Sequence, residues 1–136
     1  MADFAAMRLP AQPDVVAPDL SDVRILLQLR GGGMAHFELA AGRTSKAVTH
    51  RTVEEILFVV SGHGEMWRRQ GERDEVVTLQ RGVCLTLPLG TQFQFRALGT
   101  EPLAALAVTM PPWPGEGEAL EVRGPWPVSP RAARDA

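Results

Sequence analysis

The sequence is poor in three features that would narrow its function at once: cysteine, long apolar runs and net charge. Its one cysteine, Cys84, excludes an intramolecular disulfide, so a reducing compartment is the default expectation. Cys84 lies in an apolar, strand-like run with no activating base nearby in the sequence. We therefore expect a buried structural thiol rather than a nucleophile.

Neither a membrane nor a nucleic acid is indicated as a partner. No segment approaches the roughly 20 apolar residues of a membrane-spanning helix, and the N-terminal stretch lacks an uninterrupted apolar segment of signal-peptide length. The formal net charge is only -2, which gives no electrostatic basis for binding a polyanion. We therefore expect a cytoplasmic protein.

What the sequence does contain is a regular series of short apolar runs separated by turn residues. The runs are rich in Val, Leu, Phe and Thr, and the 13 glycines and 11 prolines punctuate the chain. We predict strands at residues 23–29, 34–40, 55–61, 64–70, 75–80, 83–88, 92–98 and 102–110. Residues 53–60 also fit a helical stripe, but the run is short and rich in β-branched and aromatic residues. The spacing predicts an all-β sandwich or barrel.

Proline-rich, aperiodic segments flank the predicted strands. With 136 residues, 45% of them hydrophobic, the chain is typical of one globular domain. We assign residues 1–20 to an extended N-terminal arm, 21–112 to the strand-rich domain and 113–136 to an extended tail. Trp113 and Trp126 would pin that tail either to the domain or to a second subunit.

Two motifs resemble those of the cupins, a superfamily of small antiparallel jelly-roll β-barrels. The first, "THRTVEEILFVVSG", brings together His50, Glu55 and Gly62, and the second, "GVCLTLPLG", has a glycine, five residues and then Pro-x-Gly. The resemblance covers residues 24–110. It implies a jelly-roll barrel with a pocket between its sheets, often in a homodimer.

The resemblance also implies a metal site, but this sequence keeps only part of the ligand set. The usual set is two histidines and a glutamate from the first motif and one histidine from the second. His50 and Glu55 match two of these positions, whereas Val48 and Phe93 occupy the other two. Imidazole and carboxylate suit Fe, Mn, Ni or Zn, so one divalent metal or none is expected.

Other residues are candidates for the cavity wall. His36 or Gln92 would add a donor to the incomplete metal set, and Thr52 shares strand alternation with His50. Phe93 would offer an apolar surface to a ligand. The predicted pocket residues are His36, His50, Thr52, Glu55, Gln92 and Phe93.

A metal-free interpretation of the first motif is also open. His50 would then contact Glu55 inside the barrel, as an acid/base dyad or a ligand-orienting pair, and the carboxylate would raise the imidazole pKa. Glu54 alternates with Glu55 and is expected at the surface. His63, between two glycines, is expected in an exposed turn.

Three function classes follow. The first is a small-molecule-binding barrel in which His50 and Glu55 orient a ligand against Phe93. The second is a metal-dependent enzyme, a dioxygenase or an isomerase/lyase, in which His50 and Glu55 are metal ligands or acid and base. The third is a structural or regulatory barrel without chemistry. One fold hosts many functions, so the resemblance does not choose among them.

Overall fold

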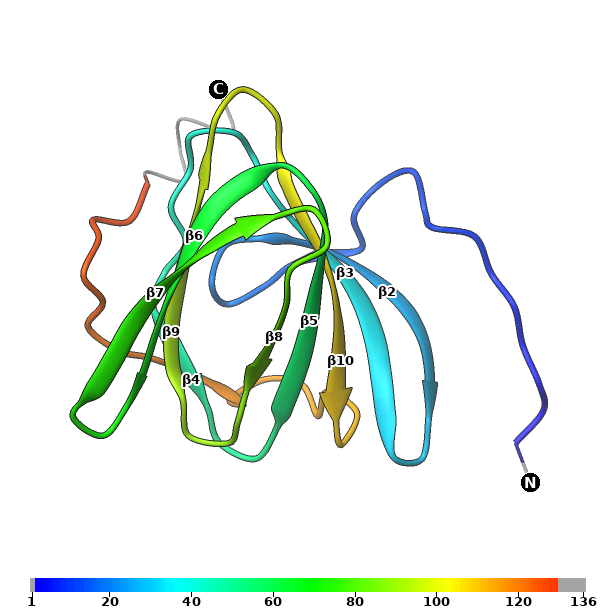
Figure 1. The fold of residues 1–136 in the computed structure, drawn as a ribbon. Helices are drawn as coiled ribbons and strands as arrows, with labels where there is room; N and C mark the ends of the chain where they lie inside the picture. Colours follow the sequence, from blue (N-terminus) through cyan, green and yellow to red (C-terminus); the bar gives the residue numbers. More distant parts are fainter. Residues whose placement is uncertain (1, 130–136) are drawn as a thin grey trace.

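A computed structural model describes residues 2–129 of the chain. In this part of the chain the backbone forms β-strands and no helix, so no described helix could cross a membrane (Figure 1). The strands are β1 (Val15–Val16), β2 (Asp22–Leu29), β3 (Gly32–Leu39), β4 (Val48–His50), β5 (Glu54–Ser61), β6 (His63–Gln70), β7 (Arg73–Gln80), β8 (Cys84–Leu87), β9 (Gln92–Leu98), β10 (Leu103–Met110) and β11 (Ala119–Glu121). The eight predicted strands correspond to β2, β3 and β5 to β10.

The strands form two antiparallel sheets that face each other. One has the order β1-β2-β3-β10-β5-β8 and the other the order β11-β4-β9-β6-β7. Consecutive strands β5 and β6 belong to different sheets, so the chain passes from one sheet to the other at Gly62. This arrangement confirms the predicted antiparallel jelly-roll barrel (Figure 1).

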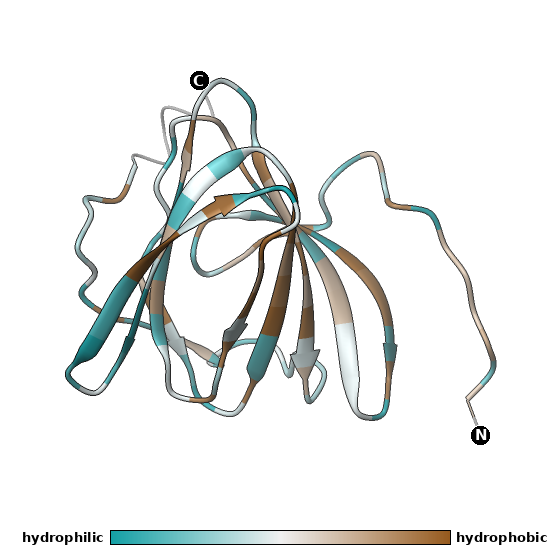
Figure 2. Ribbon diagram, viewed as in Figure 1, coloured by the Kyte–Doolittle hydropathy of each residue, from teal (hydrophilic) through white to brown (hydrophobic). Residues whose placement is uncertain are grey.

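Strand alternation explains how the core forms. In β5 the side chains of Glu55, Leu57 and Val59 are buried between the sheets, whereas Ile56 and Phe58 are exposed on the outer face. Pairing of β5 with both β8 and β10 satisfies its backbone groups, and this excludes the helical alternative for this run. Figure 2 shows the same division: hydrophobic residues follow β5, β8 and β10, and the β6–β7 hairpin tip is hydrophilic.

Alternation also corrects the expectation for Cys84. Leu85 and Leu87 of β8 point into the core, and Cys84 therefore points outward, where it is exposed. The apolar composition of the run predicted a strand, but it did not show on which face the thiol lies.

The flanks contribute to the sheets. Strand β1 pairs with β2, and β11 pairs with β4. The Gln94 amide donates to the Trp126 carbonyl at 2.8 Å, and the Arg96 guanidinium lies 4.1 Å from the centre of the Trp126 ring. The tryptophans of the tail were expected to contact either the domain or a second subunit, and Trp126 contacts the barrel of its own chain. The part of the assigned tail from residue 130 onward lies outside the described residues.

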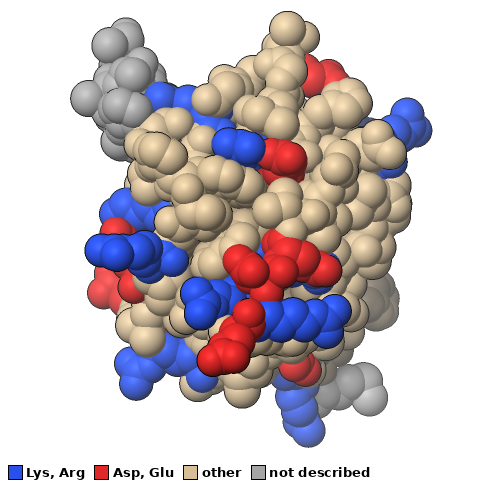
Figure 3. Space-filling model, turned by 60° about the vertical axis from the view of Figure 1, so that its left-hand side comes forward, with Lys and Arg blue, Asp and Glu red and all other residues tan. Residues whose placement is uncertain are grey.

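Charges of both signs lie side by side on the surface. On the face in Figure 3, basic and acidic side chains are interspersed rather than gathered by sign. Paired strands place opposite charges together, as in Arg96 with Glu65 at 2.6 Å and Arg68 with Glu75. Such neutralisation leaves no broad field of one sign on this face.

Candidate functional site

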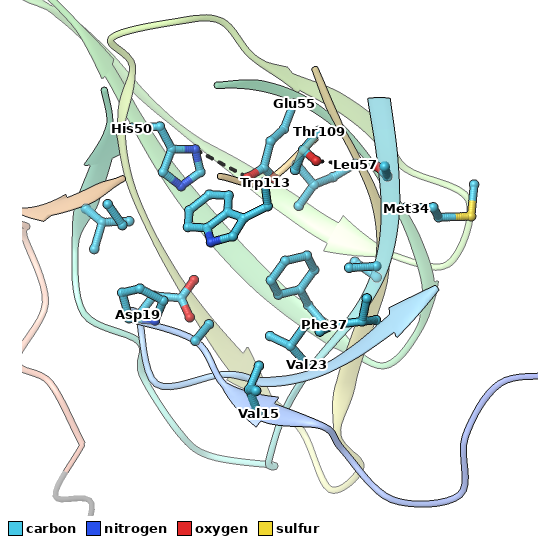
Figure 4. Close-up of a pocket in the computed structure, with 18 of the residues that line it drawn as sticks. Val15, Asp19, Val23, Met34, Phe37, His50, Glu55, Leu57, Thr109 and Trp113 are labelled. Atoms are coloured by element: carbon cyan, nitrogen blue, oxygen red, sulfur yellow. Dashed lines mark hydrogen bonds and ion pairs between the residues drawn. The ribbon is translucent and has the colours of Figure 1, made fainter. Parts of the chain in front are cut away.

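A cavity of about 650 Å³ lies between the two sheets. Its volume falls in the range of roughly 300–1,000 Å³ that is usual for small-molecule sites. Much of the wall is aliphatic or aromatic, and includes Leu57, Val59, Leu85, Phe37, Phe93 and Phe95. Polar side chains on the wall include Asp19, His50, Glu55 and Thr109, seen in Figure 4.

His50 and Glu55 form the centre of the polar wall. His50 ends β4 of one sheet and Glu55 lies near the start of β5 in the other. The imidazole Nδ1 is 3.3 Å from Glu55 Oε1, and both side chains are buried (Figure 4). The imidazole also lies edge-to-face between two aromatic rings, Phe93 at 5.3 Å and Trp113 at 4.9 Å between ring centres. These contacts fix the orientation of the imidazole.

Burial makes both groups prefer their neutral forms. Desolvation lowers the pKa of His50 to about 4, although the charge of Glu118 opposes this shift. Desolvation also raises the pKa of Glu55 to about 8, with the Asp19 carboxylate contributing in the same direction. Near pH 7 the pair is therefore a neutral imidazole beside a protonated carboxyl group. The expectation that Glu55 raises the pKa of His50 is wrong, because desolvation dominates.

Asp19 is a cavity residue that sequence reasoning missed. It lies in the turn between β1 and β2, and its Oδ1 accepts hydrogen bonds from the Ser21 amide at 3.0 Å and the Ser21 hydroxyl at 2.6 Å. The neighbouring Leu20 has φ +80°, a left-handed conformation that is uncommon for leucine. Burial raises the pKa of Asp19. An Asp-x-Ser sequence favours such a turn, but nothing local shows that the carboxyl group enters a cavity.

Two tail residues complete the site from the other end of the chain. Trp113 lies against the His50 ring and lines the cavity. Glu118 is buried, and its carboxylate accepts hydrogen bonds from Thr52 N at 2.8 Å, Thr52 Oγ1 at 2.6 Å and Val53 N at 3.0 Å. Desolvation raises the pKa of Glu118, but these hydrogen bonds and the nearby His50 outweigh it and the pKa is lowered. Glu118 thus holds the β4–β5 connection between His50 and Glu55.

Of the six predicted pocket residues, three line the cavity: His50, Glu55 and Phe93. Glu54 and His63 are exposed, as expected, but His63 is the first residue of β6 and does not lie in a turn.

The other three predicted pocket residues lie elsewhere. His36 is buried, but its neighbours Ala35 and Phe37 line the cavity, so alternation turns His36 to the opposite face of β3. Thr52 lies outside a strand and binds Glu118. Gln92 points away because the next residue along β9, Phe93, points inward.

The residues present do not fit a metal centre. Val48 and Phe93, which occupy the two missing ligand positions, are cross-strand partners between β4 and β9 and are both buried. Among the described residues, no three His, Cys, Asp or Glu side chains come close enough to hold one ion. Metal sites in enzymes usually have about three protein donors, and two donors would bind weakly.

The fold and site together define an antiparallel jelly-roll barrel with a mostly apolar cavity between its sheets. Residues 35–109 match the family model described as "Cupin domain". The chain therefore belongs to the cupin domain family. No curated protein matches the sequence.

Solved structures of similar fold have low sequence identity. An uncharacterised Klebsiella pneumoniae protein with a double-stranded β-helix domain is 16% identical, with 90% of this chain and 100% of that one covered and a TM-score of 0.66. PAC13 from Streptomyces, solved with uridine, is 14% identical with a TM-score of 0.65, and 88% of this chain and 92% of that one are covered.

Larger proteins contain the same barrel. The capsular polysaccharide assembling protein CapF from Staphylococcus aureus is 16% identical with a TM-score of 0.68. The match covers 79% of this chain and 33% of CapF, so the chain spans about a third of that protein. At these identities the similarity shows the fold alone.

Proposed function

We propose that this protein binds a small organic molecule in its barrel cavity. The observation that carries the proposal is the cavity of about 650 Å³, whose apolar wall is interrupted by the His50–Glu55 pair. A ligand would be held by burial of its apolar part, and its polar group would be oriented by His50 and Glu55. This combination of an apolar wall and a few converging polar groups is usual for small-molecule sites.

The aromatic neighbours of His50 support the same function. Phe93 and Trp113 hold the imidazole in one position, so little side-chain entropy would be lost when a ligand contacts it. Trp113 is 38% exposed and therefore reaches both the cavity and the surface. The tail is thus placed to cover a bound ligand.

We predict that His50→Ala weakens ligand binding by about tenfold or more, because it leaves a buried polar group of the ligand without its partner, which costs about 1–3 kcal/mol. A library of small molecules is first screened for compounds that raise the melting temperature. The affinities of the resulting ligands are then measured by calorimetry for both proteins. His63→Ala, which removes an exposed histidine, serves as the control and should bind like the wild type. Unchanged binding by His50→Ala would remove His50 from the site.

One observation favours an enzyme as the alternative. A neutral imidazole and a protonated carboxyl group, 3.3 Å apart, could serve as base and acid in an isomerase or lyase reaction. Metal-dependent dioxygenase chemistry would require further donors besides His50 and Glu55. If no compound in the library binds, the structural or regulatory class becomes the better interpretation.

We also propose that the protein is a homodimer. The tail tryptophans contact the barrel of their own chain, so they are not evidence for a second subunit. The proposal rests instead on the resemblance to the family and on exposed apolar side chains on the outer face of the six-stranded sheet. Ile56 and Phe58 of β5 are 42% and 45% exposed there. Light scattering at micromolar concentration should give twice the mass of one chain, and Phe58→Glu should halve it. A monomeric wild type would contradict the proposal.

A further inference from the structure

The cavity wall carries acidic groups without basic ones. Asp19, Glu55 and Glu116 line it, and none of the described lysines or arginines does. The one further titratable group is the imidazole of His50, which burial keeps neutral near pH 7. An anionic ligand would find no opposite charge there and would face carboxyl groups on the wall. The wall therefore discriminates against anions.

Two of the carboxyl groups on the wall, those of Asp19 and Glu55, are buried. Asp19 is 7% exposed and Glu55 is 5% exposed. Ser21 donates two hydrogen bonds to Asp19, and both go to Oδ1. Neither of these bonds uses Oδ2, and the carboxyl group faces the cavity in Figure 4. An acceptor oxygen that faces the cavity can take a hydrogen bond from a ligand.

Aromatic rings surround the same space. Trp113 lies beside His50, and Phe37 lines the cavity (Figure 4). Phe93 also lines the cavity. The faces of aromatic rings attract cations, tryptophan most strongly, and the attraction increases where water is excluded. A cation in this cavity would have carboxyl groups and aromatic rings as neighbours, and the aliphatic wall would cover the rest of the molecule.

We propose that the cavity is specific for an organic cation, an amine with an apolar body, whose ammonium group binds between Asp19 and Glu55 and against Trp113. This inference rests on the proposed function, since it names the class of ligand that the cavity takes. Asp19 is the residue that selects the amine. Its Oδ2 accepts a hydrogen bond from the ammonium group. The positive charge of the ligand favours the ionised form of Asp19, and the two charges then pair.

Three probes that share a phenyl ring and a two-carbon chain test the charge preference: phenethylamine, phenethyl alcohol and phenylacetate. Calorimetry at neutral pH is expected to show the amine binding at least about tenfold more tightly than the alcohol, and no binding of the carboxylate. Equal affinities for amine and alcohol would overturn the cation inference and leave the proposed function standing. Tighter binding of the carboxylate would do the same. If none of the probes binds, the inference is overturned, and the library screen separately decides the proposed function.

Two variants test whether the ammonium group binds at Asp19. Asp19→Asn should weaken amine binding by at least about tenfold and leave alcohol binding unchanged, because the carboxamide has the same shape as the carboxyl group but cannot carry a charge. Glu54→Gln removes an exposed carboxylate next to Glu55 and should change neither affinity. Should Asp19→Asn fail to fold, Trp113→Leu serves instead, since its side chain is partly exposed, and it should weaken the amine more than the alcohol. Loss of both affinities to the same extent would contradict a role in charge recognition.

Discussion

Replacing Gly62 by alanine should destabilise the fold severely, while the same change at Gly82 should be mild. Gly62 lies where the chain leaves β5 and enters β6 in the other sheet. A Cβ at Gly62 would lie 2.3 Å from the Pro102 carbonyl oxygen and 2.7 Å from Leu103 Cα. Both atoms belong to the backbone of another strand connection, so neither can move aside by a change of rotamer. Relief requires the β9–β10 connection to shift.

Gly82 provides a matched control for this change. Both glycines have positive φ, +85° at Gly62 and +93° at Gly82, so alanine is strained at either site. That strain costs about 1–2 kcal/mol per residue. A Cβ at Gly82 would meet no atom within 4 Å, so only the strain remains there. The difference between the two variants therefore isolates the close approach at Gly62.

The measurement is urea unfolding of the wild type and both variants. We expect Gly82→Ala to lower the free energy of unfolding by about 1–2 kcal/mol. Gly62→Ala should cost at least about 3 kcal/mol more, which is a large part of the stability of an ordinary domain, or should prevent folding. Similar losses in the two variants would show that the contact with Pro102 is relieved cheaply.

These glycines also show how much of the fold could be predicted from the sequence. Both belong to the motifs that resemble the cupins, and both mark turns between predicted strands. Strand alternation and turn residues are local, so eight strands and the barrel could be predicted. The different costs of alanine at the two sites could not, because the atoms near Gly62 come from residues 102 and 103.

The residues of the candidate site also fall into a set that the sequence predicted and a set that it did not. His50, Glu55 and Phe93 lie on strands whose spacing the motifs fix, and the sequence predicted them as cavity residues. Asp19, Trp113 and Glu118 lie in flanks without periodicity, and tertiary contacts such as the β11–β4 pairing place them. Local patterns carry little information on contacts between distant segments.

His36 illustrates a further limit of sequence reasoning. Alternation sorts the residues of β3 into two sets but does not say which set faces the core. Ala35 and Phe37 line the cavity, and His36 belongs to the other set. For a strand with apolar and polar residues in both sets, the choice depends on the neighbouring strands β2 and β10.

The second large effect is expected in the pH dependence of stability. Burial raises the pKa of Glu55 from 4.5 to about 8, so the folded protein holds a proton that the unfolded chain releases at lower pH. The stability that Glu55 contributes is complete below about pH 4.5 and is lost as the pH rises through 8. Glu55→Gln keeps a neutral group of the same shape and cannot ionise. The variant should therefore gain stability relative to the wild type as the pH rises.

The other buried groups of the site titrate in both proteins. Asp19 has a raised pKa and acts in the same direction as Glu55, whereas the lowered pKa of His50 removes stability as the pH falls from 6.5 through about 4. The wild type alone would therefore show a combined profile. Subtracting the profile of Glu55→Gln largely cancels these common contributions and leaves that of Glu55.

Urea unfolding of both proteins between pH 5 and pH 9 measures this difference. We expect the relative stability of Glu55→Gln to rise by at most about 1.4 kcal/mol per pH unit between 4.5 and 8, the full linkage for one proton. Glu54→Gln, which changes the exposed neighbour, should follow the wild type at every pH. Parallel profiles for the wild type and Glu55→Gln would mean that Glu55 ionises freely in the folded barrel. The acidic wall would then carry charge at neutral pH without a ligand.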